Sequence, residues 1–159
     1  MAFNIINNDL QTAGVTYPDE VQQEQTDYSA ENIVIPASFE FEGKIWNVIE
    51  IGDYAFSQCN SLESITLPPG LTRIGRYAFF KDDKLRDIVG GENIKSIGGY
   101  AFGYCSELDK VPFSDIMSEI GDYAFAYCNG LADFSSGINL KMLWIGAFYG
   151  CSGLKNVDL

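Results

Sequence analysis

The chain has 159 residues, of which 47% are hydrophobic and 14% aromatic, which is enough for one domain with a packed core. Ten Lys and Arg residues against 22 Asp and Glu residues give a net charge of −12. This balance argues against nucleic acid and anionic lipid as partners, because both require a basic surface. There is no histidine, the commonest general base and metal ligand, so we expect neither an enzyme nor a metal or cofactor site.

The sequence carries no targeting or membrane signal that we can identify. No run of 18 apolar residues occurs, so we expect no membrane-spanning helix. The first residues, MAFNIINNDLQTAG, lack the basic and apolar regions of a signal peptide. Two possibilities stay open, an intracellular protein and a mature part of an exported one.

Residues 1–50 differ from the rest of the chain and are predicted to form an N-terminal cap. Within them, NIVIPASFEFEGKIWNVIEIG alternates between apolar and polar residues around the Glu42-Gly43 pair. This pattern predicts a β-hairpin with strands near residues 33–41 and 44–49. Trp46 lies in this hairpin, where we expect it to cover the first repeat rather than to stack on a ligand.

From residue 51 to residue 159 the sequence repeats with a fixed period of 23. An Ala-Phe pair marks each copy, at Ala55-Phe56, Ala78-Phe79, Ala101-Phe102, Ala124-Phe125 and Ala147-Phe148. A period of this length is typical of a solenoid, in which each repeat (a rung) buries its apolar face against its neighbours. We therefore predict one continuous domain with five rungs, the last of them incomplete.

Each rung contains a short segment with the alternation of a strand that is buried on one side. The apolar positions are Leu62/Ile65/Leu67, Leu85/Ile88, Leu108/Val111/Phe113, Leu131/Phe134 and Leu154/Val157/Leu159. A second apolar pair then returns to the core, at Leu71/Ile74, Ile94/Ile97, Met117/Ile120 and Leu140/Leu143. An Ile-Gly turn follows, and the Ala-Phe segment is too short for a stable isolated helix, so it is predicted to form a single helical or 3₁₀ turn on the opposite side.

The polar residues between the buried strand positions must point outward, and they vary from rung to rung. Because repeat proteins commonly bind partners on such a surface, these residues are the candidate ligand-binding site. The set comprises Ser64, Thr66, Arg86, Asp87, Lys110, Asp133, Lys155 and Asn156.

The string SLESITLPPGLTRIGRYAF, preceded by IGDYAFSQC, resembles the BspA-type leucine-rich repeat, whose pattern is LxxIxLPxxLxxIGxxAFxxC. The resemblance covers about residues 31–159. It implies a right-handed α/β solenoid with short parallel strands on the concave face and short helical or 3₁₀ turns on the convex face. It also implies a cell-surface or secreted protein that adheres to host extracellular-matrix or other surface proteins. The family has no shared catalytic residues to transfer.

The chain departs from this pattern at three points. Asp82 stands in the column otherwise held by cysteine, and we expect it to turn toward Lys81, Lys84 or solvent, because an unpaired buried carboxylate is costly. In LKMLWIGAF the Ile-Gly pair is shifted by two residues, so the turn before the last rung must be rebuilt. The last rung stops at Leu159 without a cap, which suggests either truncation or end-to-end pairing of two chains through the exposed strand.

The cysteines allow three interpretations: zinc ligands, disulfides or core residues. Their spacings of 46, 23 and 23 place them in a line instead of around one point, which disfavours zinc. Parallel neighbours about 4.8 Å apart hold Cβ atoms too far apart for a good disulfide, which needs about 3.8 Å. We therefore expect buried thiols. The column consists of Cys59, Cys105, Cys128 and Cys151.

Two rows of tyrosine keep a second function open. Tyr54, Tyr77, Tyr100 and Tyr123 form one row, and Tyr104, Tyr127 and Tyr149 form the other. Exposed aromatic strips could bind sugar rings, so a carbohydrate-binding module is the alternative to a protein-binding one. A structural spacer within a larger surface protein is a third possibility.

Overall fold

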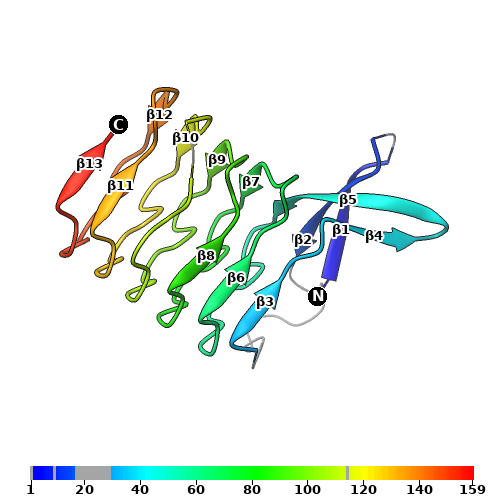
Figure 1. Ribbon diagram of the computed structural model, residues 1–159, viewed down its shortest axis with the longest axis horizontal. Helices are drawn as coiled ribbons and strands as arrows, with labels where there is room; N and C mark the ends of the chain where they lie inside the picture. The colour runs from blue at the N-terminus through cyan, green and yellow to red at the C-terminus, as the bar shows by residue number, and fades with distance from the viewer. Residues whose placement is uncertain (1, 9, 17–29, 114) are drawn as a thin grey trace.

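The computed structural model describes residues 2–8, 10–16, 30–113 and 115–159. Part of the predicted cap, residues 17–29, lies outside the described residues. Figure 1 shows two rows of short strands that run along the molecule from the N-terminal to the C-terminal end. One row comprises β3 (Asn32–Val34), β6 (Ser64–Thr66), β8 (Asp87–Val89), β11 (Asp133–Ser135) and β13 (Asn156–Asp158).

The strands of this first row pair in parallel at the predicted period. Ser64 of β6 is the register partner of Asp87 in β8, and Asp133 of β11 is the partner of Asn156 in β13, a step of 23 residues in each case. Ile65, Ile88 and Phe134 at the strand centres are buried, while their neighbours are half-buried or exposed. The predicted strand positions and their inward-outward alternation are confirmed for these rungs.

The third rung breaks the row. Residues 109–113 form no strand, so β3-β6-β8 and β11-β13 are separate sheets. Pro112 occupies the register position of Thr66 and Val89, and proline has no N–H to donate to a ladder. The rung still buries Leu108 and Phe113, so the apolar pattern survives the loss of strand pairing.

A second row of parallel strands was not predicted. It comprises β5 (Lys44–Ile51), β7 (Arg73–Ile74), β9 (Ser96–Ile97), β10 (Glu119–Ile120) and β12 (Met142–Leu143). Ile74, Ile97 and Ile120 are buried, as the sequence predicted for the second apolar pair of each rung. Their backbones also bond from rung to rung, so rungs such as the one with β6 and β7 and the one with β8 and β9 contribute to two sheets instead of one.

The predicted helical turns are wrong, because the described residues contain no helix. In the segment that follows the Ile-Gly turn, Tyr54 and Gln58 have φ angles of 60° and 62°, which are incompatible with a right-handed helix. The N–H groups of Tyr54, Phe56 and Gln58 donate to carbonyls of the next rung at 2.8–2.9 Å. Every second residue of this segment therefore donates its N–H to the next rung. The residues between them donate to a carbonyl three residues earlier in the same rung, as the N–H of Ser57 does to the carbonyl of Tyr54.

The predicted hairpin forms, but its first strand is shorter than expected. β4 (Ser38–Phe41) pairs antiparallel with β5 around Glu42-Gly43, with Phe39 opposite Trp46. Residues 32–34 instead form β3 and join the first row beside β6, separated from β4 by Pro36. Trp46 is 2% exposed, and its indole N–H donates to the carbonyl of Phe41, while its covering of the first rung stays a prediction.

Two further strands extend the sheet at the N-terminal end. β1 (Ala2–Asn7) pairs antiparallel with β2 (Thr12–Thr16), which in turn lies parallel to β5 (Figure 1). The strand order of this sheet is β1-β2-β5-β7-β9-β10-β12, with β4 paired to β5. Strands β3 and β5 therefore pair with β6 and β7 of the first rung, and the cap itself stays a prediction.

Aromatic rings fill the space between the two rows. Phe56, Phe79, Phe102 and Phe125 are fully buried, and successive rings stack with centroids 5.1–5.3 Å apart. The fifth rung departs from the predicted core. Val157 and Leu159 are 46% and 57% exposed, because this rung has a described neighbour on one side only. Leu143 of β12, the last strand of the second row, is 43% exposed for the same reason.

The prediction for Asp82 is wrong. Its side chain is fully buried in the cysteine column and does not turn toward lysine or solvent. Desolvation raises the pKa of this carboxyl well above its ordinary value of 3.8. The cysteine prediction is confirmed: all four cysteines are described, none forms a disulfide, and three are buried.

Candidate functional site

The predicted ligand-binding residues lie along the first row of strands. Ser64 and Thr66 of β6 are half-buried, and the others are exposed. Asp87 begins β8 and Arg86 directly precedes it. Lys110 comes from residues 109–113, which form no strand. Asp133, Lys155 and Asn156 come from the last two rungs. All eight therefore lie along this row and are exposed or half-buried, and their binding of a ligand stays a prediction.

Contacts between neighbouring rungs order part of this surface. The guanidinium of Arg86 lies 3.3 Å from Glu63 and 3.8 Å from Glu107, and Asn156 donates to the carboxylate of Asp133. Lys110 and Lys155 form no ion pair with a described residue. These two ammonium groups are the cations of the row that remain available to a ligand.

The same row exposes an apolar strip at its N-terminal end. Val34, Thr66 and Val89 are register partners on adjacent strands, and the two valines are 71% and 56% exposed. Apolar side chains beside a polar row give the composition of a protein-binding surface, which combines an apolar centre with polar edges.

The two tyrosine rows differ in what they offer. Tyr54, Tyr77, Tyr100 and Tyr123 stack on one another with centroids 4.9–5.2 Å apart, which hides most ring faces. Tyr104 and Tyr127 also stack, at 4.7 Å, beside a hollow of about 420 Å³. The hollow is lined by Asn60, Lys81, Asp83, Tyr104, Ser106, Tyr127 and Asn129. Desolvation, and after it the neighbouring Tyr149, raises the pKa of Tyr127 above its ordinary value.

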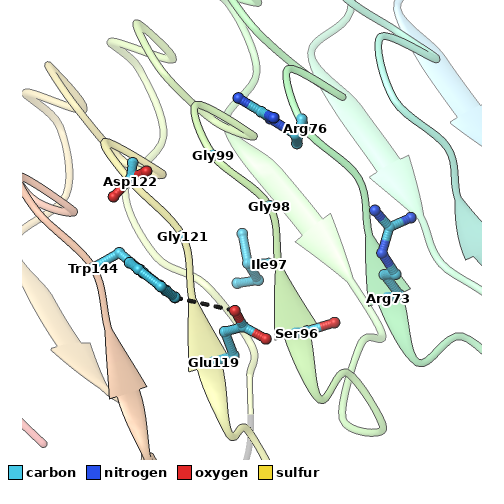
Figure 2. A pocket seen from close by; sticks show the side chains of 10 residues that line it. All are labelled: Arg73, Arg76, Ser96, Ile97, Gly98, Gly99, Glu119, Gly121, Asp122 and Trp144. Carbon is cyan, nitrogen blue, oxygen red and sulfur yellow. Dashed lines mark hydrogen bonds between the residues drawn. The ribbon is translucent and has the colours of Figure 1, made fainter.

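Sequence reasoning missed a third surface, on the second row of strands. An open hollow of about 330 Å³ lies on the outward side of β7, β9 and β10 (Figure 2). We call it the Trp144 pocket. Its lining residues are Arg73, Arg76, Ser96, Ile97, Gly98, Gly99, Glu119, Gly121, Asp122 and Trp144.

Glycines form this hollow because the rungs pack too closely there for side chains. A Cβ atom on Gly98 would lie 2.6 Å from the backbone nitrogen of Arg76, and one on Gly121 would lie 2.6 Å from that of Gly99. Gly99 occupies the position of Arg76 and Asp122 in the rungs on either side, and the Arg76 side chain lies beside it, with Nε 3.9 Å from where a Cβ would be. Glycine backbone therefore forms the base of the hollow, and charged side chains lie around it.

Trp144 stands one period after Gly121, in the register of the turn glycines. Its indole N–H donates to the carboxylate of Glu119 at 3.0 Å (Figure 2). The signal for this pocket was the shifted Ile-Gly pair in LKMLWIGAF, because the shift puts a tryptophan where every other rung has glycine.

Two other kinds of feature, a metal-binding cluster and a membrane-spanning helix, are absent from the described part of the chain. They contain no group of three or more His, Cys, Asp or Glu side chains arranged to hold a metal ion. No helix in the described ranges is long and apolar enough to cross a membrane.

Comparison with known proteins supports the repeat pattern. A family model described as "BspA type Leucine rich repeat region" matches residues 27–159 in six copies, one more than the Ala-Phe pairs mark. The match begins ahead of β3, the strand that extends the first row toward the N-terminus. No protein of curated function matches the chain.

Several solved structures are similar over nearly the whole chain. A leucine-rich repeat protein from Treponema pallidum is 26% identical, with a TM-score of 0.84 over 99% of this chain and 68% of its own. A leucine-rich cell surface protein from Faecalibacterium prausnitzii is 31% identical, with a TM-score of 0.84 over 99% of this chain and 40% of its own. The pneumococcal vaccine antigen PcpA, 20% identical with a TM-score of 0.61 over 98% of this chain and 47% of its own, shares the fold. The chain spans less than half the length of the last two.

Proposed function

The chain belongs to the BspA-type leucine-rich repeat family, and we propose that it is the adhesion module of a surface or secreted protein. A protein-interaction repeat module is the function that the family and its neighbours support. To this function the proposal adds where the protein acts, at the cell surface or outside the cell, and which residues bind the partner. In it the rungs form a right-handed solenoid, and the outward residues of the first row lie on its concave face and bind an extracellular-matrix or other surface protein.

The main support for this function is the outward face of the first row of strands. Rungs held by parallel pairing and a continuous core present exposed, non-repeating side chains at fixed intervals. A rigid surface of this kind binds without a large ordering cost, because its side chains are positioned before the partner arrives. The exposed valines and the available lysines, Lys110 and Lys155, supply both apolar and charged contacts.

The proposed extracellular location is based on two of the similar solved structures. One similar protein is described as a cell surface protein and another as a vaccine antigen, which supports an extracellular role for this chain. An acidic surface with net charge −12 suits a soluble, exposed module and favours basic partners through electrostatic steering.

The test is binding of the purified, immobilised chain to a panel of extracellular-matrix proteins and glycans. The site variant carries Arg86→Glu, Lys110→Glu and Lys155→Glu. A matched control carries Lys44→Glu, Lys95→Glu and Lys141→Glu, three exposed cations outside the row, so that both variants change the net charge equally. Protein binding that only the site variant loses supports the proposal, and equal loss in both variants contradicts the location of the site.

A second candidate is glycan binding at the hollow beside Tyr104 and Tyr127. Stacked phenol rings next to Asn60, Asp83 and Asn129 combine an aromatic surface with hydrogen-bonding groups. In the same panel, glycan binding that survives the three charge reversals and is lost in Tyr104→Ala would favour this function. Absence of binding to any protein or glycan would favour a structural spacer.

A further inference from the structure

The Trp144 pocket is divided by charge. Arg73 and Arg76 lie toward its N-terminal side, and Glu119, Asp122 and Trp144 lie toward its C-terminal side (Figure 2). Arg73 is neutralised within the chain, since its guanidinium lies 3.4 Å from both Glu50 and Asp53. The acidic side has no such compensation.

The two carboxylates keep acceptor capacity for a ligand. Glu119 accepts the indole N–H through Oε1, and its Oε2 has no hydrogen bond or ion pair to any described residue. Asp122 stands in the register of Asp53, whose carboxylate accepts the backbone N–H of Arg76 at 2.8 Å. Within the described residues, the carboxylate of Asp122 has no corresponding hydrogen bond or ion pair.

The indole of Trp144 provides an accessible aromatic surface beside these carboxylates. The side chain is 45% exposed, and the hydrogen bond to Glu119 fixes its orientation. Indole is the best aromatic partner for a cation, and the attraction grows when the cation is partly desolvated in a hollow. An exposed indole between two carboxylates with open acceptor sites is the chemistry of a cation-binding site.

We propose that the Trp144 pocket takes an arginine side chain of the partner protein, a proposal that rests on the protein-binding function. The planar guanidinium can stack on the indole while its N–H groups donate to Glu119 and Asp122. A lysine ammonium satisfies the charge and lacks the flat face for stacking. The net charge of −12 attracts a basic segment at long range.

Arg76 lines the pocket and forms no ion pair with a described residue. Arg76 and Asp122 occupy the same position two rungs apart. At the strand spacing of about 4.8 Å this places their backbones roughly 10 Å apart, one Debye length at 0.1 M salt. The Arg76 side chain nevertheless extends over Gly99, with Nε 3.9 Å from the position of a Cβ there, so the guanidinium of the partner would lie on the Glu119 and Trp144 side of the pocket.

The intact chain carries its own reporter for the test. It has two tryptophans, of which Trp46 is 2% exposed and Trp144 is 45% exposed. A titration with N-acetyl-arginine methylamide should therefore change the fluorescence of Trp144 and saturate. The matched probe is N-acetyl-citrulline methylamide, which has nearly the same shape and no charge. We expect citrulline to bind at least about tenfold more weakly.

Variants locate the effect. The double change Glu119→Gln and Asp122→Asn keeps an acceptor for the indole N–H, removes both charges and should weaken arginine binding about tenfold. The control, Glu40→Gln with Asp109→Asn, removes two exposed charges outside the pocket and should leave binding unchanged. Equal responses to arginine and citrulline, equal effects of the two double variants, or no saturable response would each overturn the proposal.

The outcome is separable from that of the proposed function. If the immobilised chain binds a panel protein through Arg86, Lys110 and Lys155 while the arginine probe fails, the pocket proposal falls and the adhesion module stands. If the probe binds as described and no panel protein binds, the pocket stands as an arginine site and the adhesion proposal fails.

Discussion

The carboxylate of Asp82 accepts a hydrogen bond of 2.8 Å from the backbone N–H of Cys59, the residue one repeat earlier in the same column. This contact explains how a carboxylate fits a position that the four other rungs fill with a buried or half-buried thiol. It satisfies one oxygen only, since Oδ2 has no hydrogen-bond partner among the described residues. The substitution therefore leaves a costly group in the core.

Replacing Asp82 with Asn should stabilise the protein by about 1–3 kcal/mol at pH 8. Desolvation raises the pKa of Asp82, so the folded state holds its proton more tightly than the unfolded chain does. The stability contributed by this group is thus fully present below the ordinary value of 3.8 and is lost as the pH rises through the folded-state pKa. Urea denaturation at pH 4 and pH 8 should show a larger gain for Asp82→Asn at pH 8.

Asp82→Cys is the matched variant, because it restores the column. Cys105, Cys128 and Cys151 each direct Sγ to a backbone carbonyl at 2.9–3.1 Å, and a cysteine at position 82 could do the same. A gain that is the same at both pH values for the Asn and the Cys variants would contradict the assignment of the effect to ionisation.

Leu108→Ala should destabilise the protein by about 2–5 kcal/mol, because it opens a cavity in a middle rung where the side chain is fully buried. Lys110→Ala, two residues along on the exposed side, should cost less than about 0.5 kcal/mol. Thermal denaturation of both variants measures the difference. Equal losses would mean that the third rung, which lacks a strand, does not keep the inward-outward pattern.

Gly98→Ala should cost about 1–3 kcal/mol, because the added Cβ would lie 2.6 Å from the backbone nitrogen of Arg76 and force two rungs apart. Gly70→Ala provides the comparison, since its Cβ would meet nothing closer than the carbonyl of Val48 at 3.4 Å. It should change stability by less than about 0.5 kcal/mol. Denaturant midpoints that fall equally would show that the close approach at Gly98 can relax.

Thiol labelling of the native protein at pH 8 should modify Cys151 first. Burial raises the pKa of Cys105, Cys128 and Cys151, but Cys151 is only half-buried and reagent can reach it. The other thiols should react after unfolding. Cys151→Ser should abolish the early phase, and rapid labelling of that variant would show that the column opens in the native state.

The sequence predicted the rungs well because a repeated side chain meets its own copy one period away. The burial of Phe56, Phe79 and Phe102 follows from an apolar residue that recurs at a fixed interval, and so do the outward positions of Asp87 and Asp133. The sequence also predicted the hairpin turn at Glu42-Gly43, because the pattern that marks it lies in the neighbouring residues.

The errors came from interactions between backbones of different rungs. The short segment around Tyr54 was read as helical because its length and composition allow a turn, yet the structure satisfies its N–H groups through the next rung. The burial of Asp82 likewise depends on the N–H of Cys59, a partner 23 residues away.

The sequence by itself determined the period, the family, the core and which residues face outward, because these depend on side-chain type at regular positions. The tertiary structure decided the second sheet, the conformation of the turns and the Trp144 pocket. Each of these depends on how closely neighbouring backbones approach, as at Gly98 and Gly121, and on which donors and acceptors meet between rungs.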